Sequence, residues 1–335
     1  MSHRSRVAFV TGGTGFVGSH LVERLLADGT EVRALVRSDP KWLEGLAVTR
    51  ISGGLSDDAA LRAGLDGVDA VYHVAGMTRA RTQAELDRAN VDGTRALLAA
   101  VQDAAPDARL LVTSSLEAMG PNATDAEGRA VPATEADPLQ PVSMYGRSKA
   151  TMEAAVWSER GGVWTTVVRP PAVYGPREAD IYAMIQGAQR GLFPIVGDGE
   201  ARRLSLVHVH DLVDGMVRAV QTDAADGETY LLGSTRGYSW NEVRAAVEAA
   251  LGRRTLRLPV PGALMGIAGA LSEGVGRLVG TLPPLTRDKA EAARHAWIGA
   301  IGKAEHDLGY RPAVDLAEGM AGTVAWYRAA GWLPA

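Results

Sequence analysis

The chain has 335 residues, of which 46% are hydrophobic and 22% are charged. This composition is typical of a globular protein, and the length suffices for one large domain or two smaller ones. A formal net charge of -4 gives no basic excess that would favour nucleic acid or an anionic membrane. The absence of cysteine excludes disulfides, thiol catalysis and thiolate-bound metal centres. We therefore expect a small-molecule substrate and a reducing compartment.

Two segments bear on the compartment. Residues 1–6 run directly into an apolar strand and lack the features of a signal peptide, so we expect a cytoplasmic protein. The most apolar late segment, residues 258–282, is interrupted by Glu273, Arg277 and several glycines. It therefore predicts a buried or lid-forming helix and no membrane span.

Short β-branched runs alternate with amphipathic stretches along the first half of the chain. Strands are expected at residues 7–11, 31–36, 69–75, 109–115 and 163–169, and helices at 16–27, 84–101 and 144–158. Parallel neighbours need right-handed crossovers, so the pattern predicts an α/β fold of the Rossmann type, a doubly wound parallel sheet.

The alternation becomes less regular after Pro170-Pro171. We expect a dinucleotide-binding domain over residues 1–175 and a smaller, mostly helical substrate-binding domain over residues 176–335. Two later segments, 205–209 and 229–232, could still return to the main sheet, so residues 203–233 could belong to the first domain.

A glycine-rich loop lies between the first strand and the first helix. Residues 11–18 read Thr-Gly-Gly-Thr-Gly-Phe-Val-Gly and contain the G-x-G-x-x-G spacing. Glycines permit a tight turn and close backbone approach, while the helix N-terminus offers free N–H groups to a pyrophosphate. The strand–turn–helix context favours a dinucleotide site over a merely tight turn.

The end of the second strand indicates which dinucleotide is bound. An acidic residue at this position binds the ribose 2′-hydroxyl of NAD, whereas an arginine suits the 2′-phosphate of NADP. The sequence has Arg37 near this position and no carboxylate at the strand end. We therefore favour NADP(H), with NAD(H) as the alternative because Asp39 is near enough to bind a ribose.

Tyr145 and Lys149 form a Tyr-x-x-x-Lys motif at the start of a predicted helix, so their side chains lie one turn apart on one face. A neighbouring ammonium favours the phenolate and brings a tyrosine towards working pH. Ser115 ends a predicted strand at the edge where ligands bind in open parallel sheets. It could donate a hydrogen bond to the substrate oxygen while Tyr145 transfers a proton.

The order and spacing of six motifs resemble the extended short-chain dehydrogenase/reductases. The motifs are Val10–Gly18, Val71–Ala75, Asn90–Thr94, Val112–Ser115, Tyr145-x-x-x-Lys149, and Arg169-Pro170 with Val173–Pro176. The resemblance implies that Ser115, Tyr145 and Lys149 are catalytic and that the protein is a homodimer through helices near residues 90–101 and 145–158. The implied cofactor contacts are Gly12, Gly15, Phe16, Val17, Gly18, Arg37, Ala75, Gly76, Tyr145, Lys149 and Pro170.

Some positions depart from this family's pattern. Gly54 stands where an aspartate often contacts the adenine. Leu116 replaces the first acid of the pair that follows the serine in sugar-nucleotide dehydratases, which disfavours dehydration. Glu117 could reach the substrate but is expected in solvent. His208 and His210 flank Val209 in a strand-like run, so they should point to opposite faces and bind no common metal.

Three functions remain open from the sequence. The first is NADPH-dependent reduction of a largely apolar carbonyl compound, as in the dihydroflavonol reductase and 3β-hydroxysteroid dehydrogenase branches. The second is a nucleotide-sugar epimerase with tightly bound NAD; against it, Leu204 stands where related enzymes carry a diphosphate-binding arginine, and Arg202 and Arg203 are displaced. The third, a non-catalytic dinucleotide sensor, is disfavoured because a sensor needs no proton relay.

Overall fold

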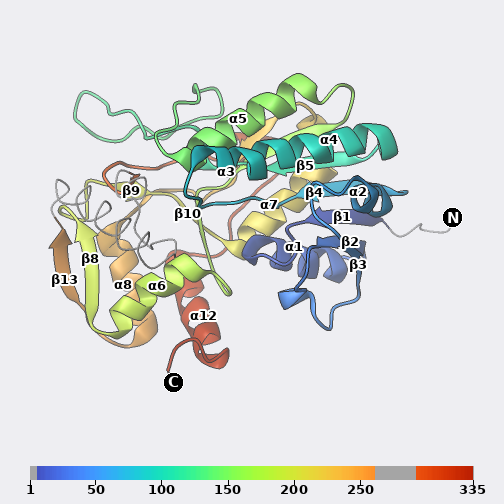
Figure 1. Cartoon of the computed structure of the whole chain (residues 1–335). Helices are drawn as coiled ribbons and strands as arrows, with labels where there is room; N and C mark the ends of the chain where they lie inside the picture. Colours follow the sequence, from blue (N-terminus) through green and yellow to red (C-terminus); the bar gives the residue numbers. More distant parts are fainter. Residues whose placement is uncertain (1–5, 261–291, 335) are drawn as a thin grey trace.

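The computed structural model describes residues 6–260 and 292–334 (Figure 1). Its centre is a seven-stranded parallel sheet in the order β11-β6-β5-β4-β1-β2-β3. These strands are β1 (Val7–Thr11), β2 (Glu31–Val36), β3 (Val48–Ser52), β4 (Ala70–His73), β5 (Arg109–Thr113), β6 (Thr165–Arg169) and β11 (Thr229–Leu231). The predicted doubly wound α/β sheet is thus confirmed.

Helices cover both faces of the sheet because the central strands carry apolar side chains on both faces. On β1, Ala8 and Val10 pack with helices α1 (Phe16–Ala27) and α7 (Val209–Gln221). Val7 and Phe9 pack on the other face, with helices α2 (Asp58–Leu65), α4 (Gly93–Ala104) and α5 (Met144–Glu159). Figure 1 shows α4 and α5 together on one side and α1 on the other.

The expected elements of the first half are present, with shorter strands than predicted. The ranges of β1, α1 and β2 match the expected ranges, whereas β4, β5 and β6 each lose residues at their ends. The helix expected at 84–101 is divided into α3 (Gln83–Asp87), a π-helical turn η2 (Arg88–Asp92) and α4. Strand β3 was not expected, because its residues are mostly exposed and carry no apolar run.

After β6 the chain forms small two-stranded sheets. Strand β7 (Ala172–Tyr174) pairs with β10 (Leu206–His208), β9 (Arg203–Leu204) with β12 (Tyr238–Ser239), and β8 (Leu192–Val196) with β13 (Leu256–Val260). The segment at 229–232 therefore returns to the main sheet beside β6, while the segment at 205–209 pairs with β7 outside it.

Helices α6 (Ala179–Gln189), α8 (Trp240–Leu251), α11 (Gly302–Asp307) and α12 (Leu316–Ala329) accompany these small sheets. A separate apolar core joins α6, α8, α12 and β8 through residues such as Ile185, Phe193, Val247 and Tyr327. Within the described ranges no helix is long and apolar enough to span a membrane. Most of the apolar segment at 258–282 lies outside the described residues.

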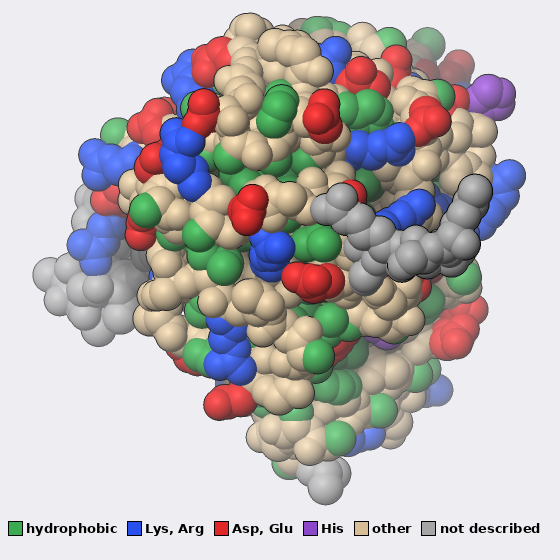
Figure 2. All heavy atoms as spheres, turned by 90° about the vertical axis from the view of Figure 1, so that its right-hand side faces the viewer, with side chains coloured by type: hydrophobic (Ala, Val, Ile, Leu, Met, Phe, Trp, Pro, Cys, Tyr) green, Lys and Arg blue, Asp and Glu red, His purple; other side chains and the backbone are tan. Residues whose placement is uncertain are grey.

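The surface beside α2 and α4 carries charges of both signs. Figure 2 shows Lys and Arg side chains interspersed with Asp and Glu across this face. Arg62, for example, pairs with both Asp58 and Asp103, and Arg95 pairs with Glu159. These pairs are open to solvent, which screens the charges, so they contribute little to stability.

Candidate active site

The loop between β1 and α1 is closed by glycine backbone contacts. Gly12 has φ +77°, and the N–H of Gly15 donates to the carbonyl of Gly12 at 3.0 Å. A Cβ on Gly18 would overlap the Gly12 carbonyl, and one on Gly12 would overlap the backbone of Ala75. Gly15 caps α1, and Phe16 and Val17 begin the helix. This cradle, open at the N-terminus of α1, fits a dinucleotide pyrophosphate.

The end of β4 connects this loop to the predicted catalytic helix. Ala75 N–H donates to Thr11 Oγ1 at 3.4 Å, and a Cβ on Gly76 would lie 3.2 Å from Lys149 Nζ and 3.4 Å from Asn90 Oδ1. Ala75, Gly76 and Lys149 therefore lie at one carboxyl edge, as the sequence predicted. A bound nicotinamide would supply or accept a hydride at this edge.

Ser115, Tyr145 and Lys149 come together from two elements. Ser115 follows β5, and its hydroxyl hydrogen-bonds the Tyr145 phenol. Lys149 Nζ lies 6.0 Å from the centre of the Tyr145 ring and donates to the Thr113 carbonyl at 2.7 Å. Helix α5 places Lys149 one turn after Tyr145, so the ammonium and the phenol lie on the same face of the helix.

The surroundings of Tyr145 do not simply lower the pKa of its phenol, as the sequence had suggested. Burial raises the pKa of Tyr145 above its usual range, the Glu117 charge raises the pKa further, and the Ser115 hydrogen bond lowers it. Burial lowers the pKa of Lys149 to about 8, while the Glu153 charge acts in the opposite direction. Without cofactor, Tyr145 is therefore a phenol poised to donate a proton.

Glu117 is closer to the site than the sequence suggested. Its side chain is half buried, and Oε2 accepts a 2.7 Å hydrogen bond from the Ser143 hydroxyl, which also caps α5 through Gly146 N–H. A Cβ on Gly146 would overlap the Glu117 carbonyl. The expectation of a solvated acid is wrong, because the start of α5 packs directly on the turn after Ser115.

A buried polar network behind Lys149 was not predicted. Glu153, one turn further along α5, accepts a hydrogen bond from Ser114 Oγ and bonds from Arg169 Nε at 3.0 Å and Nη2 at 2.7 Å. Both charged side chains are buried. The ion pair of Glu153 and Arg169 connects α5 to the ends of β5 and β6. Pro170, the residue after Arg169, accepts a hydrogen bond from Leu116 N–H. This network fixes the helix that carries Tyr145 and Lys149.

Asn90 anchors the π-helical turn η2 beside the same site. Its side-chain amide accepts from Met77 N–H at 2.7 Å and donates to Met77 O and Ser148 Oγ, both at 2.9 Å. His73 bridges Thr11 and Thr94, and burial lowers its pKa to about 3. These bonds connect the glycine loop, η2 and α5 into one rigid frame.

Arg37 lies just beyond β2 and is exposed. Its aliphatic stem faces Gly54, whose added Cβ would be 3.7 Å from Arg37 Cγ. Asp39, the alternative ribose ligand, accepts a 2.9 Å hydrogen bond from Lys41 N–H in its own turn. Among the described residues, no ion pair engages the Arg37 guanidinium.

His208 and His210 do not lie in one continuous strand, as the sequence suggested. Strand β10 ends at His208, and helix α7 begins at Val209, so the rings of His208 and His210 lie 4.8 Å apart between centroids. The expectation that they face opposite sides is wrong because the backbone changes from strand to helix between them. Burial lowers the pKa of His208 to about 4. In the ranges described, no group of three or more potential ligands could hold a metal.

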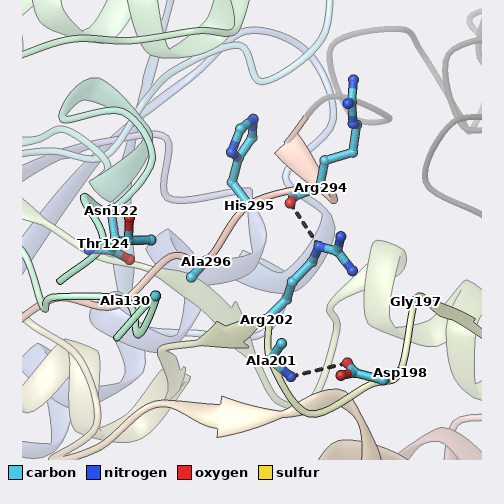
Figure 3. A pocket seen from close by; sticks show the side chains of 11 residues that line it. Asn122, Thr124, Ala130, Gly197, Asp198, Ala201, Arg202, Arg294, His295 and Ala296 are labelled. Atoms are coloured by element: carbon cyan, nitrogen blue, oxygen red, sulfur yellow. Dashed lines mark hydrogen bonds between the residues drawn. The ribbon is translucent and has the colours of Figure 1, made fainter. Parts of the chain in front are cut away.

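A cavity of about 460 Å³ lies between the loop at residues 122–130 and the C-terminal part. It is lined by Asn122, Thr124, Gly128, Ala130, Gly197, Asp198, Ala201, Arg202, Arg294, His295 and Ala296. Figure 3 shows Arg202 between Asn122 and Thr124 on one side and Asp198 on the other. Arg202 Nε donates to the Arg294 carbonyl at 2.8 Å, whereas Arg203 bonds Glu242 and does not line the cavity. The trio of Ser115, Tyr145 and Lys149 does not line it either.

Comparisons with known proteins agree with this architecture. Residues 8–233 match the NAD-dependent epimerase/dehydratase family. The chain is 34% identical to ceramide reductase of Caulobacter vibrioides, covering 98% of this chain and 96% of that one. It is 36% identical over 67% of each chain to the 4-hydroxy-2-methyl-3-oxo-4-farnesyl-3,4-dihydroquinoline-1-oxide ketoreductase of Stigmatella aurantiaca.

Solved structures give the same assignment. The dTDP-glucose 4,6-dehydratase DesIV of Streptomyces venezuelae, solved with NAD and TYD bound, superimposes with a TM-score of 0.77 at 26% identity, covering 98% of this chain and 99% of that one. The chain belongs to the NAD-dependent epimerase/dehydratase family and is an enzyme of the extended short-chain dehydrogenase/reductase type.

Proposed function

We propose that this enzyme is an NADPH-dependent reductase of a carbonyl group on a lipophilic compound. The observation that carries the proposal is the complete trio of Ser115, Tyr145 and Lys149 in a chain that aligns over nearly its whole length with a reductase. In this reaction NADPH would supply the hydride for the carbonyl carbon, while Tyr145 gives its proton to the carbonyl oxygen.

Each of the three side chains has a separate role in the proposed reaction. The Ser115 hydroxyl orients and polarises the carbonyl oxygen, and Tyr145 protonates it. The ammonium of Lys149 stabilises the phenolate that remains and binds the nicotinamide ribose. Burial first, and then the charge of Glu117, raise the pKa of Tyr145, so this phenol is protonated between turnovers. This arrangement favours reduction over oxidation.

Support for NADP(H) comes from Arg37. Its exposed side chain follows the end of β2 and lies beside Gly54. An arginine in this position suits a 2′-phosphate, and Asp39 is already engaged in its own turn. NAD(H) remains the alternative cofactor.

The substrate class is inferred from the relatives. Both the ceramide reductase and the farnesyl quinoline-oxide ketoreductase are named for substrates with long apolar parts. A binding site for such a compound needs apolar walls and few charges. We propose that the C-terminal part, residues 176–335, selects this substrate, with residues 203–233 partly returning to the main sheet.

A nucleotide-sugar epimerase with tightly bound NAD is the second candidate, and one observation favours it. Arg202 and Arg294 line the 460 Å³ cavity, and guanidinium groups bind diphosphates through paired hydrogen bonds. An epimerase uses the same trio but regenerates its nicotinamide, so it consumes no NADPH overall.

The two candidates are separated by measuring NADPH consumption. We expect net NADPH oxidation with ketones that carry long acyl, prenyl or sterol groups, dispersed in detergent. Binding of UDP-, GDP- and dTDP-sugars is measured in parallel. Tight sugar-nucleotide binding, with an epimerised product and no net NADPH oxidation, would replace the first candidate by the second.

We also propose a cytoplasmic homodimer in which α4 and α5 pair with the same helices of a second copy. Light scattering should give twice the mass of the chain. A monomer at micromolar concentration would refute this part of the proposal.

A further inference from the structure

The ribbon formed by β8 and β13 carries apolar side chains on both faces. In the parallel register Phe193 pairs with Arg257 and Ile195 with Pro259, and both Phe193 and Ile195 are buried in the core with α6 and α8. The opposite face carries Leu192 opposite Leu256 and Pro194 opposite Leu258. On this outer face Leu192 is 43%, Leu256 64% and Leu258 37% exposed.

This outer face departs from the usual pattern of a sheet that packs on one side. Such strands alternate between apolar residues facing the core and polar residues facing water. Adjacent exposed leucines on one face instead mark an interaction surface. Figure 1 places the ribbon at the margin of the molecule, at the opposite end from β1, β2 and β3.

Three exposed arginines lie where both strands begin. Arg190 immediately precedes Gly191 and Leu192, while Arg253 and Arg254 precede β13. The two strand starts are joined, because Leu256 N–H donates to the Gly191 carbonyl at 2.7 Å and Arg253 Nη1 donates to the Gln189 carbonyl at 2.7 Å.

The nearby carboxylate of Glu248 does not neutralise the three arginines. Glu248 is held by Arg244 at 2.9 Å and accepts two further hydrogen bonds from Thr255. The apolar face is therefore bordered at one end by cationic groups. Leucines that enter the headgroup region and arginines that contact phosphates form the combination used by interfacial proteins.

We propose that the outer face of the β8–β13 ribbon, together with Arg190, Arg253 and Arg254, docks the enzyme on an anionic lipid surface. The choice of a lipid surface over another apolar partner rests on the proposed lipophilic substrate, which partitions into membranes. Docking brings the C-terminal part of the enzyme to the surface where such a substrate is concentrated.

The test is cosedimentation of the full chain with vesicles. Wild-type protein should bind vesicles of equimolar phosphatidylcholine and phosphatidylglycerol, bind pure phosphatidylcholine far more weakly, and be released by salt. Arg254→Gln should weaken binding about five-fold, and Leu256→Asn about ten-fold. Val131→Asn is the matched control, because Val131 is 46% exposed and lies outside the ribbon.

Three results would overturn the docking proposal: no binding of the wild type to anionic vesicles, equal loss in Val131→Asn and Leu256→Asn, or a change of oligomeric state in Leu256→Asn, which would assign the face to a second copy. Vesicle binding needs no substrate, and turnover is measured separately on detergent-dispersed ketone. Retained vesicle binding without ketone reduction would therefore refute the proposed reaction and leave docking standing.

Discussion

Polar side chains at the carboxyl edge of the main sheet are buried and bonded to one another, whereas those around the Arg202 cavity are more open to solvent. At the edge, Ser114, Lys149, Glu153 and Arg169 are all buried. Around the cavity, Asp198 and Arg294 are exposed and Arg202 is half buried. Buried, hydrogen-bonded groups hold one geometry, while exposed groups tolerate change. The edge is thus suited to a fixed chemical step and the cavity region to a substrate choice that can vary.

The largest expected effect comes from removing the phenol at the edge. Tyr145→Phe should lower turnover by ~10³-fold, with NADPH affinity nearly unchanged, because only the proton donor is lost. Arg202→Ala is the comparison variant from the cavity, and it should retain hydride transfer. Single-turnover kinetics and nucleotide titration measure both. Near-normal turnover in Tyr145→Phe would show that the edge does not carry the chemistry.

Breaking the buried ion pair should destabilise the edge. Glu153→Gln leaves Arg169 without its charged partner and should cost about 3–5 kcal/mol of unfolding free energy. Glu159→Gln, on the same helix, breaks the half-exposed pair with Arg95 and should cost at most about 1 kcal/mol. Denaturant titration compares the two variants. Equal losses of unfolding free energy in the two variants would mean that the buried ion pair stabilises the protein no more than the half-exposed one.

The pH dependence of reduction should report Lys149. The pKa of this ammonium is lowered to about 8 by burial, so the group is charged below pH 8 and neutral above it. Because the charge stabilises the phenolate, kcat/KM for reduction should fall about ten-fold per unit as the pH rises beyond 8. Lys149→Ala should be slower throughout, bind nucleotide more weakly and lack this decline. A wild-type profile that is flat to pH 10 contradicts the role of Lys149.

A smaller effect is expected at the end of β2. Arg37→Ala should weaken NADPH binding about ten-fold and leave NADH binding unchanged, because only NADPH carries the 2′-phosphate. Fluorescence titration with both nucleotides gives the ratio. Tighter binding of NADH by the wild type, or unchanged NADPH affinity in the variant, would remove the support for NADP(H).

The sequence predicted those parts of the edge whose signals are local. The glycines of the loop at 11–18 lie within a few residues of one another, as do Tyr145 and Lys149, and Ser115 is placed by the end of a recognisable strand. Glu153 was not recognised and Glu117 was expected in solvent, because their partners Arg169 and Ser143 come from other elements and only folding brings them together. The pairing of β10 with β7 was missed for the same reason, since short strands carry little register information.

The most direct test of the account follows one hydride through the reaction. Enzyme is mixed with NADPH deuterated at the transferred position and with a long-chain ketone, and the product is examined by mass spectrometry. The account predicts one deuterium on the carbinol carbon for each NADPH oxidised, and formation of this product ~10³-fold slower in Tyr145→Phe. Deuterium-free product, or conversion of a nucleotide sugar with no NADPH oxidised, would contradict it.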